Sequence, residues 1–219
     1  MTGACDVGVL LVSGSTRSRS TNTAALRSAR ELLQPGCATL YAELAALPAF
    51  DPDRDHPPLP HPVEALRSEI AAADVVVFCT PEYAGTLPGS FKNLLDWTVG
   101  GAEIYDKPTT WINVAAPGRG TGADATLALV LGYVGASVMD TSGVRVPVPH
   151  QAVDPSGRIS DPDTRDRLRD AFETIIAEVG QDRTTETRKR RPIAGSTTAA
   201  RPPRSHVGSI SRARRKAPA

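Results

Sequence analysis

The stretch from Leu10 to Asn22, LLVSGSTRSRSTN, passes from an apolar run into a cluster of serine, threonine and arginine. The apolar run, residues 7–13, is short and rich in valine and leucine, which is typical of a strand buried on both faces. From residue 21 to residue 33 apolar side chains recur at helical spacing, and Pro35 and Gly36 then end the segment. The stretch therefore predicts a buried strand that leads through a polar loop into a helix.

The same alternation of strand and helix patterns continues along the chain. Further strands are expected at residues 37–41, 74–79, 109–115 and 137–146, and further helices at 63–72, 90–98, 123–131 and 163–179. Such alternation predicts an α/β fold, a doubly wound five-stranded parallel sheet in three α/β/α layers. In these sheets ligands bind beyond the carboxyl ends of the strands, where the strand order reverses. The loops after the first, third and fourth strands are therefore the candidate binding region.

Charge divides the 219-residue chain into two parts. Of 25 Lys/Arg and 24 Asp/Glu residues, 11 and 2 lie in residues 181–219, which leaves 14 and 22 in residues 1–180. The first part thus carries a net charge of −8 and the second +9. The second part has few apolar residues, so we expect a folded domain over 1–180 and a basic disordered tail over 181–219. A solvated tail is the simplest interpretation, and weak electrostatic binding to nucleic acid or an acidic membrane surface is the alternative.

Several classes of protein are disfavoured by composition. No apolar run approaches the length of a membrane span, and no basic segment precedes the first apolar run, so we expect a cytoplasmic protein with no membrane partner. The three cysteines form no CxxC pair and are expected to be free buried thiols. The four histidines are scattered, and no metal site is expected.

The loop after the first strand has the composition of an anion site. Ser15, Ser20 and Thr21 offer hydroxyls, Arg17 offers five N–H donors, and a helix begins near Thr21. The loop matches neither GxGxxG nor GxxxxGK[ST], which disfavours dinucleotides and nucleoside triphosphates. Its donors suit a terminal phosphate monoester. The alternative is a helix-capping cluster beside a solvated arginine.

A second stretch, Thr80–Trp97, TPEYAGTLPGSFKNLLDW, adds a resemblance to a known family. Together with GSTRSRSTN it resembles the NADPH-dependent FMN reductase family, which includes quinone, azo-dye and chromate reductases. That family carries a GSxRxxSxN loop and a PEYNxSxPGxxKNxxDW segment. The resemblance spans about residues 7–180 and implies a flavodoxin-like FMN-binding reductase domain.

The resemblance also implies a set of binding residues. The FMN phosphate would be held by Ser15, Arg17, Ser20 and Asn22, with help from the backbone of Thr21. The isoalloxazine would be lined, largely through main-chain groups, by Pro81, Glu82, Tyr83, Ala84 and Gly85, and its pyrimidine end flanked by Ala116, Pro117, Gly118 and Arg119. The family asparagine after Glu-Tyr is Ala84 here, which affects the expected choice of electron acceptor. A simple proline-initiated turn is the alternative for PEYAG.

The activity implied by the resemblance is transfer of hydride from NADPH (or NADH) to FMN and on to a small acceptor, a free flavin or quinone. The flavin carries out the redox step, so no protein acid or base is assigned as catalytic. Members of the family are generally dimers or tetramers, so the resemblance implies a homodimer or homotetramer. Two alternatives stay open at this point: a non-enzymatic flavodoxin-like FMN carrier or electron-transfer protein, and a nucleic-acid-associated regulator that acts through the basic tail.

Overall fold

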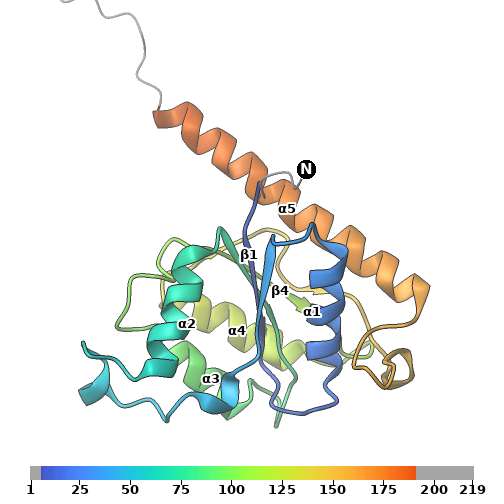
Figure 1. Cartoon of the computed structure of the whole chain (residues 1–219), viewed down its shortest axis with the longest axis horizontal. Helices are drawn as coiled ribbons and strands as arrows, with labels where there is room; N and C mark the ends of the chain where they lie inside the picture. The colour runs from blue at the N-terminus through green and yellow to red at the C-terminus, as the bar shows by residue number, and fades with distance from the viewer. Residues whose placement is uncertain (1–5, 191–219) are drawn as a thin grey trace, which may run out of the picture.

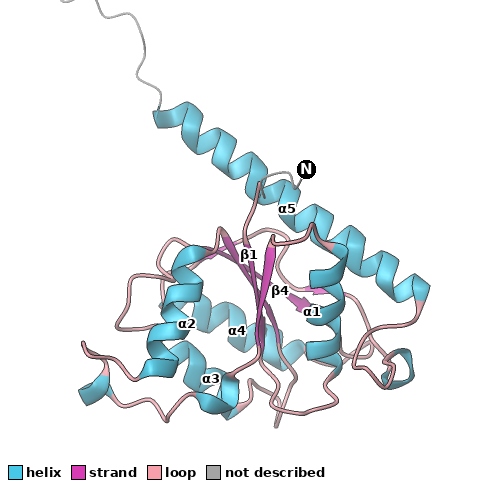
Figure 2. Cartoon of the chain, viewed as in Figure 1, coloured by secondary structure: helices cyan, strands magenta, loops and turns pink. Residues whose placement is uncertain are grey.

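A computed structural model describes residues 6–190 of the chain, with side chains up to Gln181. Strands and helices alternate along it as the sequence predicts (Figure 2). The elements in chain order are β1 (Val9–Ser13), α1 (Thr21–Leu32), β2 (Ala38–Tyr41), α2 (His61–Ala72), β3 (Val75–Cys79), α3 (Gly89–Asp96), β4 (Pro108–Asn113), α4 (Thr121–Tyr133), β5 (Ser137–Val138), β6 (Val144–Arg145) and α5 (Pro162–Arg190). Short 3₁₀ turns lie in the loops before α2 and α5.

The sheet is parallel throughout and has the strand order β2-β1-β3-β4-β5. The chain runs outward from β1 to β2 and then crosses back to β3, so the strand order reverses at the boundary between β1 and β3. At that boundary the two following loops touch, because a Cβ on Gly14 would lie 2.4 Å from Oγ1 of Thr80. This confirms the predicted fold class and places the candidate loops at one edge.

The strand predicted over residues 137–146 is instead two short segments, β5 and β6, which both pair with β4. Pro108 pairs with Ser137, and Ile112 pairs with Val144. The chain between the two pairings is longer than the stretch of β4 opposite it, so the excess residues leave the ladder as a turn. Gly143, with φ of 78°, returns the chain to the sheet.

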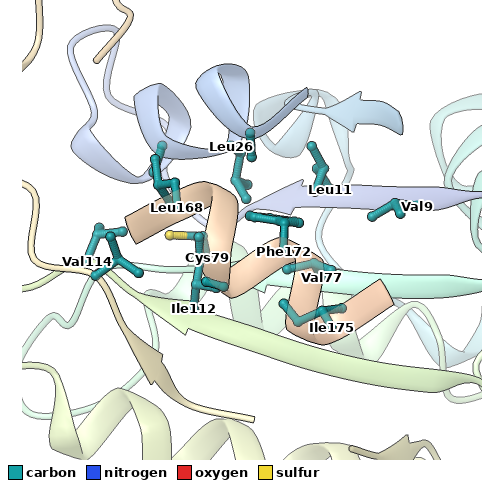
Figure 3. Close-up of a cluster of buried hydrophobic side chains, with 14 of the residues drawn as sticks. Val9, Leu11, Leu26, Val77, Cys79, Ile112, Val114, Leu168, Phe172 and Ile175 are labelled. Carbon is teal, nitrogen blue, oxygen red and sulfur yellow. The ribbon is translucent and has the colours of Figure 1, made fainter. Parts of the chain in front are cut away.

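Helices cover both faces of the sheet, α1 and α5 on one side and α2, α3 and α4 on the other (Figure 1). Along β1 the side chains alternate between the two cores. Val9 and Leu11 pack under α1 and α5, close to Leu26 and Phe172 (Figure 3), whereas Leu10 packs on the opposite face. Both faces of β1 are therefore buried, which explains its uninterrupted apolar sequence.

The structure corrects two expectations. The helix expected to end at residue 179 continues to Arg190, so residues 181–190 of the predicted disordered tail are helical. The rest of that tail, 191–219, lies outside the described residues. Cys37 is disulfide-bonded rather than a free thiol, whereas Cys79 is free and buried as expected. Within residues 6–190, none of the helices is long and apolar enough to cross a membrane.

Candidate cofactor-binding site

The loop between β1 and α1 is held in place by its own hydroxyl groups. Ser20 is the N-cap of α1, and its Oγ accepts a hydrogen bond of 3.3 Å from the backbone N–H of Thr23. Ser15 Oγ accepts a hydrogen bond of 3.3 Å from the backbone N–H of Arg17. The N–H groups of Thr21 and Asn22 belong to the first helical turn and have no acceptor inside the helix. They remain available to an anion at the positive end of the helix dipole.

A pocket of about 230 Å³ opens at this point, at the carboxyl edge of the sheet. Most of the residues predicted to bind the cofactor line it: Ser15, Arg17, Ser20, Thr21, Asn22, Pro81, Glu82, Tyr83 and Arg119. Five other predicted residues are not among those lining it: Ala84, Gly85, Ala116, Pro117 and Gly118. The pocket also includes residues that the sequence analysis did not identify: Thr80, Val114, Ala115, Gly120 and His150.

Asn22 is oriented from below by a buried cysteine. The Sγ–H of Cys79, the last residue of β3, donates a hydrogen bond of 3.2 Å to Oδ1 of Asn22. Burial, and then the charge of Asp124, raises the pKa of this thiol, which keeps it protonated as a donor. The bond occupies the amide oxygen, so the NH₂ group of Asn22 remains as the donor for a ligand.

The segment after Glu82 is a two-residue hairpin turn. Tyr83 and Thr86 exchange backbone hydrogen bonds of 3.0 and 3.1 Å, and between them Ala84 and Gly85 have φ of 50° and 76°. Positive φ at both central positions defines a type I′ turn, which favours Asn-Gly or Gly-Gly because side chains are strained there. Alanine at position 84 therefore holds the turn at a conformational cost.

The side chain of Glu82 caps α4. Its Oε2 accepts hydrogen bonds of 2.7 Å from the N–H of Gly122 and 3.1 Å from the N–H of Ala123. A Cβ on Gly122 would lie 2.1 Å from the carbonyl oxygen of Gly85, so the turn and the helix are in direct contact. The carboxylate is thus committed to α4.

A polar network fixes the loop between β4 and α4. Asn113, at the end of β4, accepts a 3.0 Å hydrogen bond from the N–H of Ala115 and donates one of 2.7 Å to Asp124. Arg145, from β6, contacts Asp124 at 3.2 Å and donates a 2.9 Å hydrogen bond to the carbonyl of Arg119. The sequence offered little sign of this network, because its members meet only when β6 pairs with β4.

The donor set of the pocket fits a phosphate monoester. Among the described residues Arg17 has no carboxylate partner, and it lies beside the hydroxyl of Ser15 and the amide of Asn22. These groups and the first N–H groups of α1 are donors to an anion. In the described part of the chain no group of three or more His, Cys, Asp or Glu side chains is placed to hold a metal ion.

A parallel sheet in the order 2-1-3-4-5, with a loop rich in hydrogen-bond donors after its first strand, is the arrangement of flavodoxin-like mononucleotide-binding proteins. The sequence model of the NADPH-dependent FMN reductases matches residues 7–151, and the chain belongs to this family. It is accordingly an NAD(P)H-dependent oxidoreductase with FMN as its flavin.

Known proteins agree with this assignment. The chain is 31% identical over 173 residues to an NAD(P)H-dependent FMN reductase of Pseudomonas aeruginosa, which covers 78% of this chain and 94% of the relative. It is also 31% identical over 170 residues to a quinone reductase of Escherichia coli, covering 73% and 88% of the two chains. Among solved structures, FerB, a flavoenzyme NAD(P)H:(acceptor) oxidoreductase of Paracoccus denitrificans, aligns with a TM-score of 0.68 at 25% identity, over 80% of this chain and 98% of that one.

Proposed function

We propose that the chain holds FMN in the pocket between β1 and β3 and uses NADPH or NADH to reduce a small quinone or free flavin. The observation that carries this proposal is the asymmetry of the pocket. One end is built of hydrogen-bond donors around Arg17, which has no carboxylate partner in the described part of the chain, and the other is the exposed turn at Tyr83. A phosphate fits the first end and a flat ring open to solvent fits the second.

At the phosphate end each residue has its own role. Arg17 supplies charge and two parallel donors, Ser15 and Ser20 shape the loop, and the N–H groups of Thr21 and Asn22 complete the cradle. A phosphate monoester carries about −1.5 to −2 charges near neutrality. The net negative charge of residues 1–180 makes this local cluster of donors necessary.

At the ring end the chain provides positioning rather than proton transfer. Pro81 and Tyr83 line the pocket, whereas Ala84 and Gly85 shape the turn behind them, and Arg119 lines the pocket from the loop between β4 and α4. When bound, FMN supplies the chemistry of hydride acceptance and of electron delivery to the acceptor. The small residues of the turn keep one side accessible, so reductant and acceptor use the same opening in turn.

Anaerobic stopped-flow mixing of the FMN-loaded protein with NADPH or NADH tests the proposal. Loss of flavin absorbance within the turnover time, followed by recovery when a benzoquinone is added, is the expected result. Parallel initial-rate plots against both substrates are expected as well. A flavin that neither coenzyme bleaches would favour the carrier function instead.

We infer a homodimer from the outer face of α4. Leu129 and Tyr133 are 61% and 85% exposed there, and Ala125, Ala128 and Gly132 extend the same stripe without a charge. An apolar stripe of this kind is a usual mark of an interface. Sedimentation of Leu129→Glu is expected to show a smaller species than the unchanged chain, with Ala65→Glu on α2 as the control. Equal masses would contradict the assignment.

We also propose a cytoplasmic location, because NADPH and FMN are supplied there. The disulfide at Cys37 is uncommon in that compartment, so its redox state in the cell is informative. Cell fractionation tests the proposal directly. Recovery of the protein with membranes or in the culture medium would contradict it.

A further inference from the structure

A second cavity, of about 400 Å³, adjoins the cofactor pocket on the α1 side. Its walls are residues 17–20 of the first loop, Arg27 of α1, and residues 150 and 153–157 before α5. Arg17, Ser20 and His150 line both cavities, so the two share a wall. A single elongated ligand can therefore reach from one into the other.

The second cavity is strongly basic. Arg17, Arg19 and Arg27 line it, and none of the three has a carboxylate partner among the described residues. Asp154 is the one acidic residue in its walls. Three guanidinium groups against one carboxylate, in a domain of net negative charge, create a local field that attracts anions.

The carboxylate of Asp154 is already engaged within its own loop. Its Oδ1 accepts hydrogen bonds of 2.6 Å from Oγ of Ser156 and 3.0 Å from the N–H of Arg158. The bond from Ser156 is the main cause of a lowered pKa at Asp154. Asp154 thus stays ionised and stabilises the turn, and because it forms no ion pair with Arg17, Arg19 or Arg27 among the described residues, positive charge remains in excess in the cavity.

Arg27 is fixed to the wall of the cavity by the backbone opposite. Its Nη1 donates a hydrogen bond of 3.2 Å to the carbonyl of Gly157, whose φ is 77°. A Cβ at position 157 would lie 2.6 Å from the same Nη1, so only glycine lets the guanidinium approach this closely. One donor of Arg27 is used in this contact, and its other N–H groups remain for a ligand.

FMN has a single phosphate, and the first pocket already provides donors for it. The other phosphorylated reactant is the reduced coenzyme, and NADPH differs from NADH by one phosphate monoester on its adenosine. We propose that the second cavity binds the 2′-phosphate of NADPH through Arg19 and Arg27, and that it makes the enzyme prefer NADPH to NADH. This inference rests on the proposed function, which leaves the choice of coenzyme open.

Calorimetric titration of the FMN-loaded protein tests the cavity without turnover. The probes are 2′,5′-ADP, 5′-AMP and inorganic phosphate. 2′,5′-ADP is expected to bind at least about tenfold more tightly than either of the others. Arg19→Ala removes charge-assisted hydrogen bonds from an exposed position and is expected to weaken 2′,5′-ADP about tenfold. Arg30→Ala, on α1 with Arg27 but outside the cavity, is the control and is expected to bind like the unchanged protein.

Steady-state kinetics provide the second measurement. In Arg19→Ala and Arg27→Gln, kcat/KM for NADPH is expected to fall about tenfold while kcat/KM for NADH and the affinity for FMN stay the same. Equal losses for both coenzymes, or equal binding of 2′,5′-ADP and inorganic phosphate, would overturn the assignment. If 2′,5′-ADP binds but neither coenzyme reduces the flavin, the proposed function fails and the anion site stands. Reduction by both coenzymes without 2′,5′-ADP binding refutes the site alone.

Discussion

The thiol of Cys79 at the end of β3 and the amide oxygen of Asn22 in the first turn of α1 are joined by a 3.2 Å hydrogen bond. The bond crosses the point where the strand order reverses, and 57 residues of sequence separate its partners. A residue with no access to solvent thereby sets the orientation of a side chain in the cofactor pocket. Cys79 is a positioning residue.

Cys79→Ala removes this donor and is expected to weaken FMN binding about three- to tenfold, the range for one neutral hydrogen bond. Cys79→Ser retains an O–H donor and is expected to bind FMN nearly as well as the unchanged protein. Flavin fluorescence titration measures both, at a temperature where circular dichroism shows both variants folded. An equal loss in the serine variant would assign the effect to packing.

Arg17→Ala is expected to weaken FMN binding about ten- to a hundredfold, because a charge-assisted hydrogen bond contributes about 1.5–3 kcal/mol. Riboflavin lacks the phosphate, so its affinity should change far less. Arg17→Lys keeps the charge without the planar fork, so its affinity for FMN is expected to lie between that of Arg17→Ala and that of the unchanged protein. If both ligands lost affinity equally in the same titration, Arg17 would not be the phosphate ligand.

Ala84→Gly is expected to raise the free energy of unfolding by about 1 kcal/mol, because it removes the left-handed strain of alanine at φ of 50°. Ala65→Gly on the exposed face of α2 is the matched control. The same substitution there should lower stability by about 0.5–1 kcal/mol, since glycine weakens a helix. Urea unfolding of both variants gives the two values, and a loss of stability at position 84 would refute the strain.

Ala84→Asn restores the family residue at the same turn. Because residue 84 is exposed beside the opening at Tyr83, the substitution should alter the ranking of acceptors more than the affinity for FMN. Relative kcat/KM for a series of quinones and free flavins measures the ranking. An unchanged series with altered FMN affinity would show that position 84 acts on the cofactor.

Tyr41 should make stability depend on pH in the alkaline range. Burial, followed by the charges of Glu69 and Glu43, raises the pKa of Tyr41 from 10.0 to about 12. Between pH 10 and pH 12 the hydroxyl of Tyr41 therefore stays protonated in the folded state but ionises in the unfolded chain. The stabilisation is complete below pH 10 and is lost as the pH rises toward 12.

Tyr41→Phe is expected to remove that loss. Among residues 6–190 the buried hydroxyl of Tyr41 has no hydrogen-bond partner, so at pH 8 the variant should match the unchanged protein within about 0.5 kcal/mol. At pH 11 it should be relatively more stable, by up to about 1 kcal/mol. Chemical unfolding of both proteins at pH 8 and pH 11 measures these differences. If the difference in free energy of unfolding between the variant and the unchanged protein were the same at both pH values, Tyr41 would not be the cause of the alkaline loss of stability.

Local patterns were sufficient to predict the fold and to select nine of the residues that line the candidate pocket. The apolar run of β1 predicted burial on both faces, and its side chains do divide between two cores. The split of the last predicted strand into β5 and β6 escaped prediction because it depends on register with β4. The extension of α5 escaped it because no apolar repeat continues past Val179, which left that part of the helix without a periodic signal.

The sequence could single out the first loop as a candidate phosphate site because Ser15, Arg17 and Ser20 lie together in it, and the structure places all three at one pocket. The hydrogen bond from Cys79 and the position of His150 at the pocket could not be predicted, because only the tertiary fold brings β3 and the loop before α5 to that place. The contact between Arg27 and Gly157 joins residues 130 positions apart. Motifs thus identify residues that act on a ligand from one loop, and only topology identifies the partners that complete the cavity.

The hydrogen bonds between Glu82 and the start of α4 affect any attempt to engineer the range of electron acceptors. Oε2 of Glu82 accepts hydrogen bonds from Gly122 and Ala123, and Gly122 is in contact with Gly85. Substitutions in the hairpin and at the start of α4 will therefore be non-additive, so the stability change of a double variant will differ from the sum of the two single changes. A randomised library that fixes positions 82 and 122 and varies 83, 84 and 86 should retain far more folded clones than one that varies all five.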